Sequence, residues 1–149
     1  MIIENSMSIE EYRSQGKKKR SYTDHEHQEQ VAIFEWAEIM SNAYPELELL
    51  HAIPNGGVRG WQTAKKLKAE GVKAGVPDIF LPVSKEKYHG LYIELKYGKN
   101  TTSDAQKWWI SRLTTEGYLV KTCYGADEAI HLLSEYLLIS DLKVGSLEK

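Results

Sequence analysis

The feature that most constrains the fold is a strict alternation of apolar and polar residues over residues 90–97. Successive side chains of a β-strand point to opposite faces, so this pattern predicts a strand with one apolar and one polar face. The apolar face holds Leu91, Ile93 and Leu95, and the polar face holds Tyr92, Glu94 and Lys96. A strand of this kind needs a covering layer on its apolar side.

The rest of the chain alternates between helical and strand patterns. Helices are predicted at 23–42, 61–70, 103–116 and 127–138, and strands at 47–53, 77–83 and 118–124 in addition to 90–97. Pro45 ends the first helix, and Gly71 and Gly117 suit the positions after two others. The predicted fold class is therefore α/β, with a central mixed β-sheet flanked by helices.

Length and composition allow one domain of this kind. The 149 residues are 42% hydrophobic, so the chain can form a core without disulfides or a structural metal. We expect a polar arm over residues 1–22, a folded domain over 23–139 and a tail over 140–149. No apolar run approaches the roughly 18–20 residues of a membrane span, and no signal-peptide pattern is present. We therefore expect no membrane partner. Because Cys123 is also the single cysteine, we expect a reducing, cytoplasmic compartment.

Charge is distributed unevenly along the chain. The formal net charge is −2, yet residues 1–57 carry −5, residues 58–100 carry +5 and residues 101–149 carry −2. A basic centre in an acidic protein fits a surface that binds nucleic acid. It equally fits an ordinary solvated surface.

Three residues of the basic centre suggest hydrolytic chemistry. Asp78 opens one predicted strand, and Glu94 and Lys96 share a face of the next, so pairing through residues 84–89 brings them to one end of the sheet. Two carboxylates about 4 Å apart repel by roughly 4 kcal/mol at an effective dielectric constant near 20, which favours binding of a cation. Mg²⁺ prefers oxygen ligands and assists phosphodiester hydrolysis. Taken alone, Glu94 and Lys96 also fit an exposed, ion-paired strand face, and Asp78 fits a turn.

The first predicted helix places polar groups on the same side as its apolar stripe. The stripe consists of Ile33, Trp36, Ala37 and Met40. At about 100° per residue, the side chains that project from this side one or two turns earlier are Glu26, Glu29 and Gln30. These polar groups are predicted to face the core or a cleft.

The spacing of Asp78 and, sixteen residues later, Glu94-x-Lys96 resembles the core motif of the PD-(D/E)XK nuclease superfamily. Over about residues 24–138 the chain is similar to the virus-type replication-repair nuclease (VRR-NUC) family. The segments that carry this similarity are GVPDI (75–79), YIELK (92–96), SDAQKWW (103–109) and GY (117–118). The resemblance implies a restriction-endonuclease-like core and a Mg²⁺-dependent DNA phosphodiesterase, in which Mn²⁺ is expected to substitute. It further implies that Asp78 and Glu94 are metal ligands and that Lys96 is the catalytic lysine.

The same resemblance assigns roles to two further side chains. The family has a glutamate near the start of its first helix, for which Glu26 and Glu29 compete. We favour Glu26, also as a metal ligand, because it stands four residues before Gln30 on the inward face. The family's helix glutamine matches Gln106, which implies a role beside the metal or at a DNA phosphate. Gln106 also completes a capping box with Ser103, and the two roles are compatible.

A glycine-rich loop enters the basic centre. Its backbone amides and the basic side chains after it are candidate phosphate contacts, namely Asn55, Gly56, Arg59, Lys65, Lys66 and Lys73. The alternative is a plain turn followed by a solvated helix. The loop is neither GxGxxG nor a Walker motif, so no nucleotide cofactor is expected.

Together, residues and resemblance predict a metal-dependent DNA endonuclease, structure-selective on branched DNA such as four-way junctions or flaps, in DNA repair or recombination. Within the nuclease class, an enzyme with little preference for DNA shape comes second. The alternatives of another class are a non-catalytic DNA-binding module that retains the fold, and an interaction protein whose acidic face meets a basic partner. Because a four-way junction needs two nicks, we expect a homodimer. Its candidate interface residues, which core packing could also explain, are Leu137, Leu138, Ile139 and one of Trp108 and Trp109.

Overall fold

The structure is a computed structural model and describes residues 22–54 and 60–139. Its centre is a four-stranded sheet in the order β1-β2-β3-β4. The strands are β1 (His51–Ala52), β2 (Ile79–Leu81), β3 (Leu91–Lys96) and β4 (Leu119–Tyr124). The first three strands pair antiparallel, whereas β3 and β4 pair parallel. The predicted mixed sheet and the pairing of β2 with β3 through residues 84–89 are thus confirmed.

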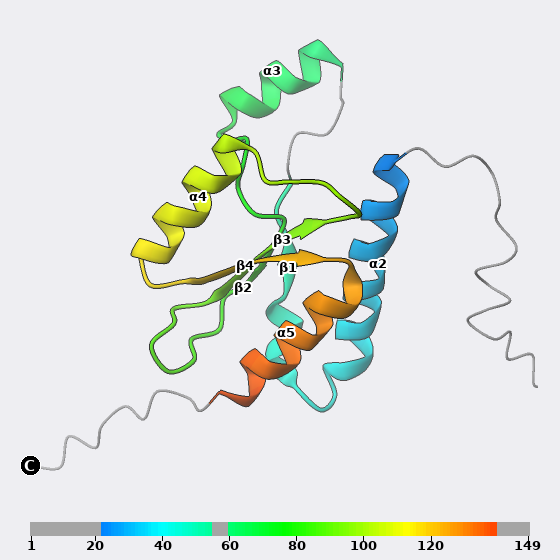
Figure 1. The fold of residues 1–149 in the computed structure, drawn as a ribbon, viewed down its shortest axis with the longest axis vertical. Coiled ribbons are helices and arrows are strands. Elements are labelled where there is room, and N and C mark those ends of the chain that lie inside the picture. Colours follow the sequence, from blue (N-terminus) through cyan, green and yellow to red (C-terminus); the bar gives the residue numbers. More distant parts are fainter. Residues whose placement is uncertain (1–21, 55–59, 140–149) are drawn as a thin grey trace, which may run out of the picture.

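The described residues form four α-helices in addition to the sheet (Figure 1). They are α2 (Tyr22–Met40), α3 (Trp61–Ala69), α4 (Asp104–Thr115) and α5 (Ala126–Leu138). Helix α4 makes the crossover that a parallel pair of strands requires, here between β3 and β4. Figure 1 shows α2 and α5 side by side, with α4 on the other side of the sheet and α3 projecting beyond one end of it.

The core lies between the sheet and the pair of helices α2 and α5. Leu91, Ile93 and Leu95 are fully buried on one face of β3, as their alternation predicts. Helix α2 contributes Ile33 to this layer, and α5 contributes Leu133. The polar face of β3 is therefore left for α4, whose first turn covers Glu94 and Lys96.

One predicted element is wrong. Residues 47–53 do not form a single strand, because the 3₁₀ helix Pro45–Leu49 takes up the first part and only β1 follows. Proline suits the first position of a helix, and the three-residue spacing of buried Leu47 and Leu50 matches the period of a 3₁₀ turn. An apolar run of this kind fits a strand equally well when only the sequence is read.

The other predicted elements are confirmed, and their ends differ from the prediction by a few residues. Gly71 and Gly117 follow α3 and α4 with φ angles of 96° and 92°, which suit the position after a helix C-terminus. Ser103 caps α4 as expected. Within the described residues, no helix has the length and apolar character needed to cross a membrane.

Candidate active site

Asp78, Glu94 and Lys96 meet at one end of the sheet. Asp78 precedes β2, and since Ile79 pairs with Ile93, its side chain lies beside the last residues of β3. One carboxylate oxygen of Asp78, Oδ2, accepts a hydrogen bond from the backbone N–H of Leu95 at 2.8 Å. Asp78 and Lys96 are eighteen positions apart in the chain. The antiparallel register brings both of them, with Glu94, to the same end of the sheet.

Glu94 is a buried carboxylate whose two oxygens differ in their hydrogen bonding. Its side chain is 1% exposed, and that of Lys96 is 9% exposed. Oε1 of Glu94 lies 3.0 Å from Nζ of Lys96 and also accepts a hydrogen bond from Nε2 of Gln106. Oε2 has no hydrogen-bond partner among the described residues. The pair is therefore ion-paired but not exposed, so the alternative of a solvated strand face is wrong.

The carboxylates of this site disfavour each other's charge. Burial, and next the charge of Asp78, raise the pKa of Glu94 from 4.5 to about 7, against the opposing effect of Lys96. Burial and the charge of Asp78 also raise the pKa of Glu26 above its ordinary value. A cation relieves such repulsion, and strongly shifted carboxylates of this kind gather at functional sites.

Gln106 holds Glu94 and Lys96 in place. Its Oε1 accepts hydrogen bonds from Nζ of Lys96 at 3.1 Å and from the backbone N–H of Ser103 at 2.8 Å, while its Nε2 donates to Glu94. The backbone N–H of Gln106 in turn donates to Oγ of Ser103 at 3.2 Å, which completes the capping box. Both geometries expected for Gln106 occur together, so the cap of α4 also orients the amide at the site.

Glu26 and Glu29 lie one turn apart on α2 and have different surroundings. Glu26 interacts with the charges of Asp78 and Lys96 and forms a side-chain hydrogen bond with Asn100. Oε2 of Glu29 accepts a hydrogen bond from the backbone N–H of Ala126 at 2.6 Å, at the beginning of α5. Glu26 therefore faces the carboxylate cluster, whereas Glu29 caps a neighbouring helix.

The residues fit a hard cation that keeps part of its own hydration. No three Asp, Glu, His or Cys side chains within residues 25–54 and 60–139 converge closely enough to surround a metal ion by themselves. Mg²⁺ commonly binds through only one or two carboxylates and completes its shell with water and substrate phosphate. The unpaired Oε2 of Glu94 and the neighbouring carboxylate of Asp78 are donors of this type.

The predicted phosphate contacts are only partly described. Asn55, Gly56 and Arg59 lie outside the described residues. Lys65 and Lys66 are exposed on α3, and Lys73 is exposed on the segment that follows it. None of the three contacts the carboxylate cluster through any ion pair found in the described residues.

Sequence reasoning missed two features around the site. Asn100 bonds to Glu26 from the loop after β3, and no local pattern marks it. Trp61 begins α3 with Lys65 positioned over its ring, and the i, i+4 spacing of an aromatic and a lysine was the available signal.

The candidate dimer residues divide between core and surface. Leu137 is buried and Ile139 packs against the core, whereas Leu138 and Trp108 are exposed.

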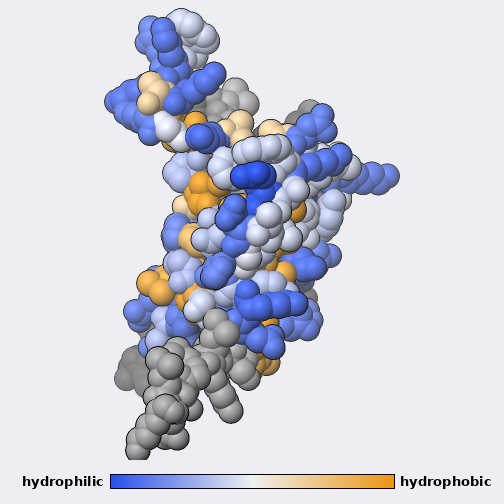
Figure 2. All heavy atoms as spheres, turned by 90° about the vertical axis from the view of Figure 1, so that its left-hand side faces the viewer, coloured by the Kyte–Doolittle hydropathy of each residue, from blue (hydrophilic) through white to orange (hydrophobic). Residues whose placement is uncertain are grey.

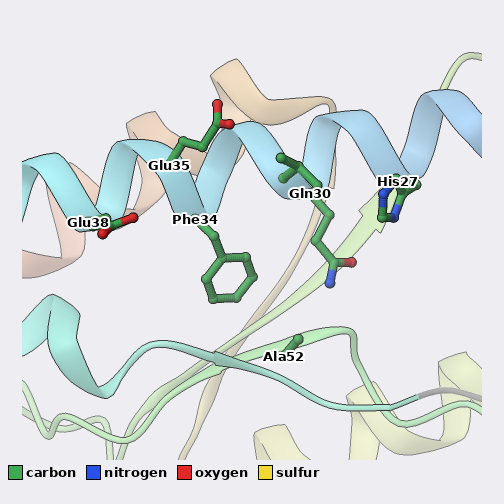
Figure 3. Close-up of a pocket in the computed structure, with 7 residues that line it drawn as sticks. His27, Gln30, Phe34, Glu35, Glu38 and Ala52 are labelled. Carbon is green, nitrogen blue, oxygen red and sulfur yellow. The ribbon is translucent and has the colours of Figure 1, made fainter.

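A hollow lies between α2 and β1. It has a volume of about 330 Å³ and is lined by His27, Gln30, Val31, Phe34, Glu35, Glu38 and Ala52. Figure 3 shows Gln30 and Phe34 pointing from α2 toward the strand that carries Ala52. Gln30 thus faces a cleft, as predicted.

Comparisons with known proteins agree with this architecture. A family model described as the VRR-NUC domain matches residues 9–127. A solved structure described as a VRR_NUC domain protein superposes with a TM-score of 0.66 and 29% sequence identity, over 78% of this chain and 91% of the other. No curated protein matches the chain. The matched span begins inside the predicted arm, and the domain limits at 23 and 139 stay a prediction.

Proposed function

Since this chain belongs to the VRR-NUC family, we propose that it is a metal-dependent DNA endonuclease whose active site lies at the end of β3. The family has a nuclease-type fold, for which DNA is the natural partner. The observation that carries the proposal is Glu94, a buried carboxylate with one oxygen unpaired among the described residues, beside the charges of Asp78 and Glu26.

The carboxylates give the site its affinity for a cation. Asp78 and Glu94, with Glu26 nearby, would hold Mg²⁺, and Mn²⁺ is expected to replace it because both prefer oxygen ligands. A divalent cation bound there supplies an acidified water and stabilises charge on the phosphodiester. Binding of the cation would lower the pKa of Glu94, so that its carboxylate is charged at neutral pH.

Lys96 and Gln106 prepare the site for one geometry of attack. Two of the three N–H donors of Lys96 are directed at Glu94 and Gln106 in the described structure, which leaves one for water or a phosphate oxygen. Gln106 cannot rotate its amide without losing the hydrogen bond from Ser103. The side chains are thus oriented before substrate binds, which is the main protein contribution to electrostatic catalysis.

The substrate we propose is branched DNA. The acidic cluster alone repels phosphate, so the basic surface of α3 has to provide the attraction. Cleavage of both strands of a four-way junction needs two sites, and one chain has one such cluster among its described residues. A symmetric homodimer supplies the second site.

The decisive experiment is cleavage of a panel of single-stranded, duplex, flap and four-way DNAs in Mg²⁺, Mn²⁺ or EDTA. We expect cleavage with either metal, none in EDTA, and faster cleavage of branched than of linear DNA. Binding without cleavage under every metal condition would instead support the non-catalytic module.

Light scattering at micromolar concentration should give about twice the 17.0 kDa chain mass, and a monomeric mass would contradict the dimer.

A further inference from the structure

Helix α3 differs from α2, α4 and α5 because it packs least against the other helices and strands. It contains nine residues, none of which is buried, and only Leu67 is half-buried. Figure 1 shows it projecting past the end of the sheet. Helices shorter than about 12–15 residues are marginal in water without tertiary packing. The exposed surface of α3 is therefore available to a binding partner, and its chemistry indicates which kind.

The surface of α3 combines an exposed indole with a high density of positive charge. Trp61 is 76% exposed, and Nζ of Lys65 lies 5.4 Å from its ring centroid. Lys66 and Lys68 lie on the same helix, which carries no acidic residue between 61 and 69. Figure 2 shows hydrophilic residues covering this end of the molecule. An indole beside ammonium groups suits a nucleic-acid strand, since the ring stacks on a base and the ammonium groups attract phosphates.

The segment after α3 is fixed beside the active site. Nε1–H of Trp109 donates to the carbonyl oxygen of Ala74 at 3.1 Å. Gly75 approaches the first turn of α4 so closely that a Cβ atom would lie 2.7 Å from the carbonyl carbon of Ala105. The next residue of that turn is Gln106, which contacts Glu94 and Lys96. The segment that follows α3 thus contacts the helix that orients Glu94 and Lys96.

We propose that Trp61 and Lys65 form a stacking site for an unpaired base of the DNA substrate, with Lys66 and Lys68 contacting the adjoining phosphates. The inference rests on the proposed function, because it takes DNA as the substrate of the site at the end of β3. It defines the substrate class as DNA that carries unpaired nucleotides, such as a flap, fork or gap. In a regular duplex the bases are stacked on one another and offer no free face.

Trp108 supplies a matched control. It is 58% exposed, and Arg112 lies 6.0 Å from its ring centroid, so it too is an exposed indole with a neighbouring cation. Its helix carries Asp104 as well as Lys107 and Arg112, and therefore has less net positive charge than α3. Stacking on DNA is assigned to Trp61 because, of these two helices, α3 combines the exposed indole with more lysines and no acidic residue within 61–69.

The test compares binding of paired and unpaired DNA in EDTA and in Ca²⁺. The probes are a 20-base-pair duplex and the same duplex with an unpaired flap that carries 2-aminopurine, whose fluorescence falls on stacking. We expect Trp61→Ala to weaken binding of the flap DNA by about tenfold to a hundredfold and to abolish the fluorescence loss, with under threefold effect on the duplex. Trp61→Phe should retain most of the flap affinity. Trp61→Leu should lose it, and Trp108→Ala should bind like wild type.

Several outcomes would overturn the inference. Equal losses on duplex and flap DNA, or flap affinity retained by Trp61→Leu, exclude stacking. If Trp61→Ala instead lowers the molecular mass in light scattering and leaves DNA binding intact, α3 is a protein interface. Failure of the wild type to bind flap DNA also refutes it. These results are independent of hydrolysis, so absence of Mg²⁺-dependent cleavage would remove the nuclease proposal without changing the binding comparison. Thermal unfolding confirms that each variant is folded.

Discussion

The end of β3 and helix α3 carry their charged side chains in opposite ways. At the end of β3, Glu94 and Lys96 are buried and hydrogen-bonded to each other and to Gln106. On α3, the lysines are exposed, and Lys66 makes only a 3.9 Å ion pair with Glu70. Burial fixes position and strengthens electrostatic effects, which chemistry requires. Exposure preserves long-range attraction, which encounter with a polyanion requires.

The contrast predicts that substitutions in the two regions affect different properties of the protein. A change at the end of β3 should alter turnover and leave DNA affinity largely intact. A change on α3 should alter affinity and its dependence on salt, without changing the chemistry of bond cleavage. The experiments below test the two regions, beginning with the largest expected effect.

The largest effect is expected from Asp78 and Glu94, the carboxylates that we propose as metal ligands. Asp78→Asn or Glu94→Gln should lower the cleavage rate by roughly 10²–10⁴-fold, because each removes a charged ligand while keeping a similar shape. Single-turnover cleavage in Mg²⁺ and DNA binding in EDTA give the two quantities needed. Glu116→Gln, an exposed carboxylate at the end of α4, is the control. Near-normal cleavage by Asp78→Asn would remove this site from the chemistry.

The next effect concerns stability without metal. The pKa of Glu94 is raised to about 7 in the folded protein, from 4.5. Its contribution to stability is therefore fully present below about pH 4.5 and is lost as pH rises through 7. At about 1.4 kcal/mol per pKa unit, the free energy of unfolding in EDTA should fall by about 2–3 kcal/mol between pH 5 and pH 8 through this group.

Urea unfolding of wild type and Glu94→Gln at both pH values isolates this contribution, since the variant lacks the titrating group. The decrease in unfolding free energy should be larger in the wild type than in the variant, and Mg²⁺ should stabilise the wild type most at pH 8. Identical pH dependence in the two proteins would show that the surroundings of Glu94 do not raise its pKa.

How far the sequence could predict this site follows from the range of the interactions involved. The positions of Asp78, Glu94 and Lys96 follow from strand alternation and from pairing of neighbouring strands, which local patterns reveal. The capping box likewise placed Gln106 at the start of α4. The 3₁₀ helix Pro45–Leu49 was missed because its apolar spacing fits two structures, and only packing of Leu47 decides between them.

The choice between Glu26 and Glu29 could not be derived from the sequence. Both project from the inward side of α2, and their roles depend on which element packs opposite each turn. The N-terminus of α5, ninety-seven residues along the chain, receives Glu29. Asn100, from the loop after β3, receives Glu26. No periodicity reports contacts of this kind, since they arise only when distant elements are assembled.

These different surroundings yield the third prediction. Glu26→Gln should lower the cleavage rate by about tenfold to a hundredfold, as expected for a group that supports a metal site. Glu29→Gln should change cleavage less than threefold, because its amide oxygen can still accept from Ala126, and should lower the unfolding free energy by about 0.3–1 kcal/mol through the lost charge at a helix N-terminus. Rates in Mg²⁺ and urea unfolding of both variants decide the point. A larger rate loss for Glu29→Gln would transfer the catalytic role to it.

The smallest effect should come from the exposed lysines of α3. Replacing Lys65 and Lys66 with Ala removes charges that are almost fully compensated by solvent, so folding stability should hardly change. Loss of two phosphate contacts should flatten the slope of log affinity against log salt by up to about 0.9 per contact on duplex DNA, irrespective of base sequence.

Lys87 and Lys121 provide a charge-matched control, because both are exposed and Lys87 lies in the loop that leads into the opposite end of β3. If the control pair flattens the slope as much as the α3 pair, the attraction comes from net charge alone. A difference between the pairs places the DNA along α3, and unchanged single-turnover cleavage at saturating enzyme separates this surface from the buried cluster of Glu94.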